Sequence, residues 1–300
     1  MRKLSAFLKF AVLAIVVLFF FLKAEGQINI NFREIFNFST KDEYASPYIY
    51  MVDRGTEEAV YEKNADSKAY PASLTKIMTT IVALEHIDDL AAVASVDLET
   101  YRKMVAANAS MAGFYGREAV TYRDLLYGTV LNSGGEAANS LAIHVGGSVG
   151  NFVQMMNDKA AELGMKNTRF ANPEGLHHTN QYTTAADMAR LLDYALDNNN
   201  FRAIFTKETF QTSSTPDHPK GVLLQSTVLA SLDKANQTGF EIICGKSGTT
   251  YEAGQCWATL GVIGDREYIT IVMGAPLENI SKPDYAQRAD TLKLFARTGK

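Results

Sequence analysis

The sequence has few of the residues that would indicate metal or nucleic-acid chemistry. It contains two cysteines and five histidines in 300 residues, with no H-E-x-x-H segment and no cysteine cluster. The adjacent pair His177-His178 is typical of a polar loop. Lys and Arg number 29 against 33 Asp and Glu, for a net charge of -4, so no general basic surface is expected. We expect no metal, no cofactor and no nucleic-acid partner.

The two cysteines, Cys244 and Cys256, lie on either side of Lys246. A disulfide between them would need facing positions on paired strands. The sequence does not establish that register, and two buried free thiols are the favoured reading.

The chain also lacks an apolar run long enough to cross a bilayer. Its longest run, Phe10–Leu22, has 13 residues, short of the ~20 that a membrane-spanning helix needs. Basic residues precede the run, and the small residues Ala24 and Gly26 follow it. This pattern predicts a secretory signal peptide over residues 1–26, cleaved before Gln27. An uncleaved anchor, which would keep the protein associated with the membrane, is the alternative. Both readings predict an extracytoplasmic domain.

The rest of the chain predicts one α+β domain over residues 27–300, with no internal repeat and no linker. Strands are expected at 48–52, 59–62, 240–246, 255–263 and 268–273, and helices at 74–84, 125–131, 136–144, 148–163, 184–196 and 284–297. Strands at both ends of the chain predict one antiparallel sheet that joins them. The mostly helical segment of about 85–200 is then a subdomain inserted between them.

Ser73 and Lys76 carry the clearest chemical signal. They are three residues apart at the start of a predicted helix and so share one face. A serine becomes a nucleophile when a neighbouring base takes its proton, and a lysine serves as that base when burial or a nearby cation lowers its pKa. The same spacing recurs at Ser231 and Lys234, in a polar segment without helical periodicity. We interpret the second copy as coincidental.

Two further segments complete the pattern. Ser133 lies in a predicted turn between helices, where its hydroxyl would relay a proton. The alternative is a purely structural role in an ordinary Ser-Gly turn. Residues 246–249 (Lys-Ser-Gly-Thr) lie on a predicted strand. Lys246 and Ser247 would bind a carboxylate, Gly248 would allow close approach of substrate, and the Thr249 N–H would bind an oxyanion. A phosphate-binding loop is rejected because Phe240 stands where that motif requires glycine.

The chain resembles the serine-type D-Ala-D-Ala carboxypeptidases, low-molecular-mass penicillin-binding proteins of the bacterial cell wall. The resemblance covers about residues 48–295. It rests on Tyr61–Asp66, Pro71–Thr79, Asp124–Tyr127 leading to Ser133, Glu162–Asn167, Asn172–Leu176 and Lys246–Gly248.

The resemblance implies a β-lactamase/transpeptidase-like fold, with the site between a sheet and a helical subdomain. It implies that Ser73 is acylated, with Lys76 as its base and Ser133 as the proton relay. It implies that Lys246 and Ser247 hold the terminal carboxylate of a peptidoglycan stem pentapeptide. It also implies backbone N–H groups of Ser73 and Thr249 as the oxyanion hole, and β-lactams as covalent inhibitors. The expected location is the cell wall or the outer face of the cytoplasmic membrane.

One position departs from the family pattern. Gly135 stands where the family usually has asparagine, and the neighbouring Asn132 is one residue out of phase. The lost amide motivates an alternative hypothesis, a catalytically weak wall-binding or regulatory homologue. A serine β-lactamase is a third, less favoured reading, because no E-x-x-L-N segment is present and Glu174 lies in Asn-Pro-Glu-Gly-Leu instead.

Overall fold

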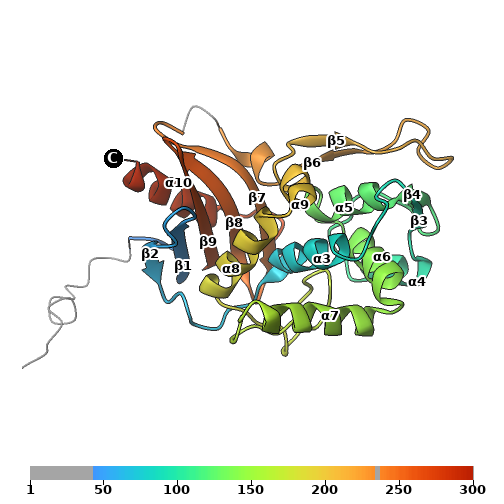
Figure 1. Cartoon of the computed structure of the whole chain (residues 1–300), viewed down its shortest axis with the longest axis horizontal. Coiled ribbons are helices and arrows are strands. Elements are labelled where there is room, and N and C mark those ends of the chain that lie inside the picture. The colour runs from blue at the N-terminus through green and yellow to red at the C-terminus, as the bar shows by residue number, and fades with distance from the viewer. Residues whose placement is uncertain (1–42, 234–236, 300) are drawn as a thin grey trace, which may run out of the picture. The chain divides into compact units, whose positions relative to one another are not determined.

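A five-stranded antiparallel sheet, in the order β2-β1-β9-β8-β7, forms the centre of the fold (Figure 1). Its strands are β1 Tyr48–Asp53, β2 Ala59–Lys63, β7 Glu241–Thr250, β8 Gly254–Ile263 and β9 Arg266–Ala275. β1 pairs with β9 in a register that sets Ile49 opposite Val272. Segments from opposite ends of the sequence therefore meet within one sheet, which confirms the predicted topology.

The computed structural model describes residues 43–233 and 237–299. Tyr44–Lys300 forms one compact unit. The predicted signal peptide over residues 1–26 lies outside the described residues, and so does Lys234 of the second Ser-x-x-Lys copy. None of the helices described has both the length and the hydrophobicity needed to cross a membrane.

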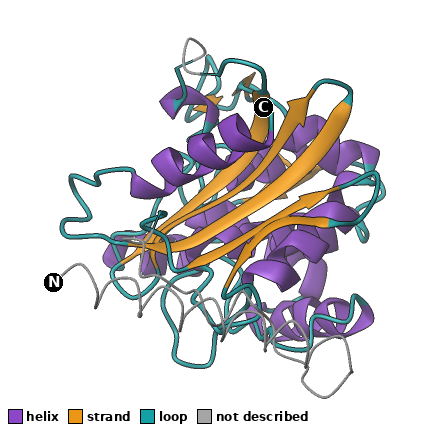
Figure 2. Ribbon diagram, turned by 90° about the vertical axis from the view of Figure 1, so that its left-hand side faces the viewer, coloured by secondary structure: helices purple, strands orange, loops and turns teal. Residues whose placement is uncertain are grey.

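Helices cover both faces of the sheet (Figure 2). Alternate side chains of β9 enter two separate apolar cores, because successive residues of a strand point to opposite faces. Ile269 and Ile271 belong to the larger core, which lies among the helices of the inserted segment. Tyr268 and Val272 belong to the smaller core under α10 (Ala286–Thr298). The sheet is thus a buried platform, and one of its edges is β7.

The segment between β2 and β7 is mostly helical. It contains a 3-10 turn η1 Ala72–Leu74, helices α3 Thr75–Leu84, α4 Leu98–Ala106, α5 Tyr122–Val130, α6 Gly135–Gly146, α7 Val149–Glu162, α8 Ala185–Leu196 and α9 Asn199–Phe205, and the turn η2 Leu229–Ser231. Two small hairpin ladders pair β3 Val93–Ser95 with β4 Ala119–Thr121, and β5 Thr209–Gln211 with β6 Leu223–Gln225. α8 packs against β1 and β9. The limits of about 85–200 for the subdomain stay a prediction.

Local sequence signals explain most helix ends. Thr121 and Asp124 form the predicted reciprocal capping box at the start of α5. Gly147 ends α6 with a left-handed φ of 72°. α4 was not predicted, although Leu98, Tyr101 and Met104 recur in it at helical spacing; only Thr100 and Met104 of this helix are buried.

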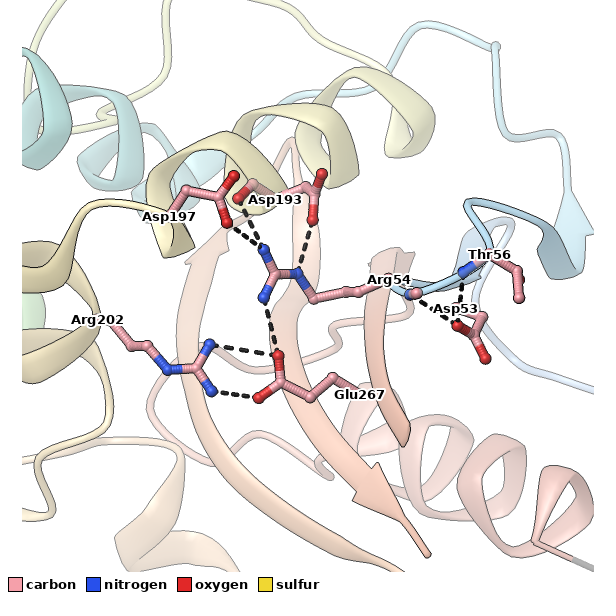
Figure 3. A network of polar contacts seen from close by, with 8 residues as sticks. Asp53, Arg54, Thr56, Asp193, Asp197, Arg202 and Glu267 are labelled. Carbon is pink, nitrogen blue, oxygen red and sulfur yellow. Dashed lines mark hydrogen bonds and ion pairs between the residues drawn. The ribbon is translucent and has the colours of Figure 1, made fainter. Parts of the chain in front are cut away.

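Arg54, in the turn after β1, ties three elements together (Figure 3). Its guanidinium contacts Asp193 of α8 at 2.6 Å, Asp197 at 2.8 Å and Glu267 of β9 at 2.8 Å. Arg202 of α9 binds the same Glu267 carboxylate. The side chains labelled in Figure 3 thus join α8 and α9 to the sheet.

The two cysteines are buried free thiols. In the β7–β8 ladder, Cys244 pairs with Leu260 and Cys256 pairs with Gly248. Gly248 lies four residues after Cys244, so the cysteines are separated by roughly 13 Å along the strand, well beyond the reach of a disulfide. Burial raises the pKa of both thiols.

Candidate active site

Ser73 lies in the tight turn η1, two residues before α3 begins at Thr75. Ala72, just before it, has a φ of 46°, an uncommon conformation for a residue with a Cβ. Two glycines allow other segments to press on this turn. A Cβ added at Gly175 would lie 2.1 Å from the Ala72 carbonyl oxygen, and one added at Gly248 would lie 2.9 Å from the Ser73 nitrogen. The nucleophile predicted from sequence is therefore held between β7 and the loop that contains Gly175.

Lys76 lies one helical turn after Ser73, as its spacing predicted. Its Nζ donates a hydrogen bond of 3.1 Å to Ser73 Oγ and a second, short one to the backbone carbonyl of Glu174. The side chain is 2% exposed. Burial lowers the pKa of Lys76 to about 8, and the carboxylates of Glu174 and Glu136 partly oppose that shift. About a tenth of Lys76 is thus a neutral amine at pH 7, and about half at pH 8.

The predicted Lys-Ser-Gly-Thr segment lies on β7. Lys246 is 1% exposed and donates to the Ser247 carbonyl oxygen at 2.9 Å. Burial holds the pKa of Lys246 well below its usual value, and the nearby charge of Lys76 lowers it further. The Ser247 hydroxyl shares a 2.7 Å hydrogen bond with that of Thr227. Two buried lysines with lowered pKa values thus lie close together beside Ser73, and such shifts are typical of functional sites.

Ser133 joins α5 to α6 with a left-handed φ of 60°. Its hydroxyl is buried and has no hydrogen-bond partner among the described residues. A buried hydroxyl without a partner costs about 1–3 kcal/mol, and left-handed backbone at a non-glycine residue adds to that cost. Such features persist most often at functional sites, which supports a role for this hydroxyl beyond that of an ordinary turn.

Gly135 begins α6, and its amide donates to the Ser110 carbonyl oxygen at 2.7 Å. A Cβ added there would lie 2.9 Å from Met104 Sδ. Met104 thus occupies space that an asparagine at this position would need. Asn132 points elsewhere, as expected from its phase: its amide binds the Ala112 carbonyl oxygen and the Gln225 N–H.

A cleft of about 630 Å³ opens beside Ser73. Of the residues predicted from sequence, Ser73, Lys76 and Thr249 line it, whereas Ser133, Lys246, Ser247 and Gly248 are not part of its lining. Its other walls come from residues 107–110, from Gly135, from 174–177, from 250–252, and from Ile280, Ser281 and Pro283. Ser231, of the second Ser-x-x-Lys copy, is not part of this lining, and its hydroxyl donates to the Val228 carbonyl oxygen.

Two polar residues of the site were not predicted. Glu174 lines the cleft and is 6% exposed. Asn139, buried on α6, donates from Nδ2 to Glu174 Oε2 at 3.1 Å and to the Gly135 carbonyl oxygen at 2.9 Å. Asn139 follows Gly135 by one helical turn, so the helical period was the signal available for it. Glu174 had appeared only as part of the family's Asn-Pro-Glu-Gly-Leu segment.

No group of three or more histidine, cysteine, aspartate or glutamate side chains within residues 43–233 and 237–299 is arranged to hold a metal ion. The cleft brings together the Ser73 hydroxyl, the Lys76 amine and the Glu174 carboxylate, which are parts of a nucleophilic acyl-transfer site.

Comparison with known proteins agrees with this chemistry. The family described as D-alanyl-D-alanine carboxypeptidase, peptidase S11, matches residues 36–277. The chain belongs to this family. Family membership confirms the resemblance drawn from the sequence motifs.

Individual relatives give the extent of the likeness. The chain is 30% identical to a D-alanyl-D-alanine endopeptidase of Escherichia coli over 87% of this chain and 80% of that protein. It is 29% identical to the D-alanyl-D-alanine carboxypeptidase DacF of Bacillus subtilis over 75% of this chain, but it covers only 56% of that relative's length. The crystal structure of a Streptomyces DD-transpeptidase superposes with a TM-score of 0.75 at 28% identity, over 87% of this chain and 98% of that one. The predicted α+β, β-lactamase/transpeptidase-like fold is therefore confirmed.

Proposed function

We propose that this protein is a serine D-Ala-D-Ala carboxypeptidase that removes the terminal D-alanine from peptidoglycan stem pentapeptides. The observation that carries the proposal is the 3.1 Å hydrogen bond between Lys76 Nζ and Ser73 Oγ at the wall of the cleft. Membership of the D-alanyl-D-alanine carboxypeptidase family supports the choice of substrate.

The proposed reaction begins when neutral Lys76 accepts the Ser73 hydroxyl proton. Ser73 Oγ then attacks the carbonyl carbon of the penultimate D-alanine, and the backbone N–H groups of Ser73 and Thr249 bind the oxyanion. The C–N bond breaks, the leaving D-alanine amine takes the proton, and an ester on Ser73 remains. Ser133 relays the proton between Lys76 and the leaving amine. Water then hydrolyses the ester.

The two lysines divide the work between them. Lys246, with Ser247, binds the terminal carboxylate, whereas burial lowers the pKa of Lys76 toward the neutral form that a base requires. Gly248 keeps β7 close enough for the substrate backbone to lie between this strand and Ser73. β-Lactams, which carry a carboxylate beside a reactive amide, are proposed to acylate Ser73 in the same orientation.

The proposed location is outside the cytoplasm, at the cell wall or the outer face of the cytoplasmic membrane. Its support is the predicted signal sequence over residues 1–26 and the peptidoglycan substrate. Membrane association through an uncleaved N-terminal segment is part of the same proposal. Protease accessibility of the domain on intact cells, with and without residues 1–26, tests it.

The activity is tested with the exported domain and fluorescent penicillin, beside Ser73→Ala. The proposal expects covalent label on the wild type, none on the variant, and release of D-alanine from a pentapeptide. Absence of label on the folded wild type would overturn the assignment of the nucleophile. Label without D-alanine release would instead support the weak homologue that Gly135 suggests, and fast catalytic turnover of penicillin would support a β-lactamase.

A further inference from the structure

Glu174 is a buried carboxylate in the wall of the cleft that the proposed acylation chemistry does not use. Its backbone carbonyl accepts the hydrogen bond from Lys76 Nζ, and Lys76 also contacts the Ser73 hydroxyl. The next residue, Gly175, lies against the Ser73 backbone. The carboxylate is therefore carried by the same loop that positions the proposed nucleophile and its base.

That loop is held from several sides. Asn172 accepts the Gly175 N–H at 2.7 Å and donates to the Leu176 carbonyl oxygen at 2.8 Å, which closes the loop on itself. The Thr79 hydroxyl of α3 donates to the Pro173 carbonyl oxygen at 2.6 Å. These contacts fix the backbone on both sides of Glu174, so the carboxylate needs little reorganisation before it acts.

The carboxylate itself is oriented by a single side-chain contact. Asn139 Nδ2 donates to Oε2, while Oε1 accepts no hydrogen bond from another described residue. Because Glu174 also lines the cleft, this second oxygen is available to a molecule bound there. Burial raises the pKa of Glu174, and the charge of Lys76 opposes that change. A carboxylate in such surroundings is a stronger proton acceptor than one in water.

We propose that Glu174 is the general base that activates the hydrolytic water during breakdown of the acyl-enzyme on Ser73. The inference rests on the acyl-enzyme of the proposed function. A water proton passes to Oε1 as the water oxygen bonds to the ester carbonyl carbon. The bond from that carbon to Ser73 Oγ then breaks, Oγ takes a proton back from Glu174, and the peptide leaves with the new carboxyl group. Lys76 is thus the base for acylation, and Glu174 is the base for deacylation.

The test separates these two steps in Glu174→Gln, which keeps the shape and the acceptor for Asn139 but removes the basic oxygen. Fluorescent penicillin measures the rate of acylation, and a chase with unlabelled penicillin, followed by intact-protein mass spectrometry, measures the lifetime of the adduct. We expect acylation within about threefold of wild type and deacylation slowed about 100-fold or more, within the range for loss of a general base. A pentapeptide should release one equivalent of D-alanine in a burst. Glu162→Gln, which removes an exposed carboxylate on α7, is the matched control and should behave as wild type.

Each other result has a defined meaning. A folded Glu174→Gln protein that deacylates at the wild-type rate overturns the inference and leaves the proposed function intact. Equal loss of both steps also overturns it, because Glu174 would then act through Lys76. If the wild type is never labelled, the proposed function fails first and the inference fails with it. Glu174→Asp, which withdraws the carboxylate by one methylene, should give an intermediate adduct lifetime and serves as the second variant if Glu174→Gln is unstable.

Discussion

The Lys76 ammonium nitrogen lies 3.1 Å from the Ser73 hydroxyl oxygen in the wall of the cleft. Ser73 lies in η1 and Lys76 in the first turn of the adjoining α3, so a single turn of backbone brings the two side chains together. Its chemistry depends on more distant residues. Burial, opposed by the carboxylates of Glu174 and Glu136, decides whether Lys76 is an amine or an ammonium.

The first prediction concerns the pH dependence of acylation. Only neutral Lys76 accepts a proton, so the rate of labelling by penicillin should rise with pH through a midpoint near 8. For that midpoint the neutral fraction, and with it the rate, increases about tenfold from pH 7 to pH 9. Burial lowers this midpoint, and the carboxylates of Glu174 and Glu136 partly oppose that shift. Stopped-flow labelling on protein shown to be folded at each pH measures the curve, and a midpoint near 10.5, the usual value for lysine, would contradict it.

The second prediction concerns Gly248. An added Cβ would lie 2.9 Å from the Ser73 nitrogen and 3.1 Å from the Leu74 nitrogen, and these backbone atoms have little room to move. We expect Gly248→Ala to slow acylation about 100-fold, the scale of a displacement of about 1 Å at a reacting group. Gly150→Ala on α7 is the control, because its Cβ would find only Ser148 Oγ, at 4.0 Å. Labelling of Gly248→Ala at the wild-type rate would refute the close approach.

The parts of the site that depend on local geometry could be predicted from the sequence. Ser73 and Lys76 share a helix face because of the helical period alone, and the capping box of α5 is readable at Thr121 and Asp124. The edge strand β7 was predicted from its apolar character, although it continues to Thr250 rather than ending at Lys246.

The parts that depend on distant contacts were not predictable. Lys76 meets the carbonyl of Glu174, which lies 98 residues further along the chain. Likewise, the space beside Gly135 is filled by Met104 of α4, and helical periodicity does not show which residue of a distant helix reaches a given position. The sequence shows the glycine at position 135, but it does not show that Met104 fills the space that an asparagine side chain would take there.

The third prediction concerns the packing of position 135 against Met104. Gly135→Asn alone should destabilise the fold, because its Cβ would meet Met104 Sδ at 2.9 Å and Cγ at 3.2 Å. Met104→Ala alone should cost about 2–4 kcal/mol, the usual range for a buried methionine. In the double variant the clash is absent. Its loss of unfolding free energy should therefore be smaller, by about 1 kcal/mol or more, than the sum of the losses in the two single variants. Chemical denaturation of all four proteins measures the coupling, and additive costs would contradict it. The same double variant should release D-alanine faster than wild type if the missing amide limits the reaction.

The last prediction concerns Arg54. Its guanidinium is 14% exposed and faces the carboxylates of Asp193, Asp197 and Glu267. Removing it leaves three like charges near one another, so Arg54→Ala should lower the free energy of unfolding by about 1–3 kcal/mol. The loss should be smaller than for a fully buried network, because two of the carboxylates are well exposed. Arg54→Lys should restore little of this, since one ammonium cannot reach three carboxylates in the geometry of a planar guanidinium. Lys103→Ala, which breaks an exposed ion pair with Glu99 on α4, is the control and should leave the unfolding midpoint unchanged. Because none of these residues lines the cleft, folded Arg54→Ala should be labelled by penicillin at the wild-type rate. A loss of labelling would instead show that a change in this network alters the position of Ser73.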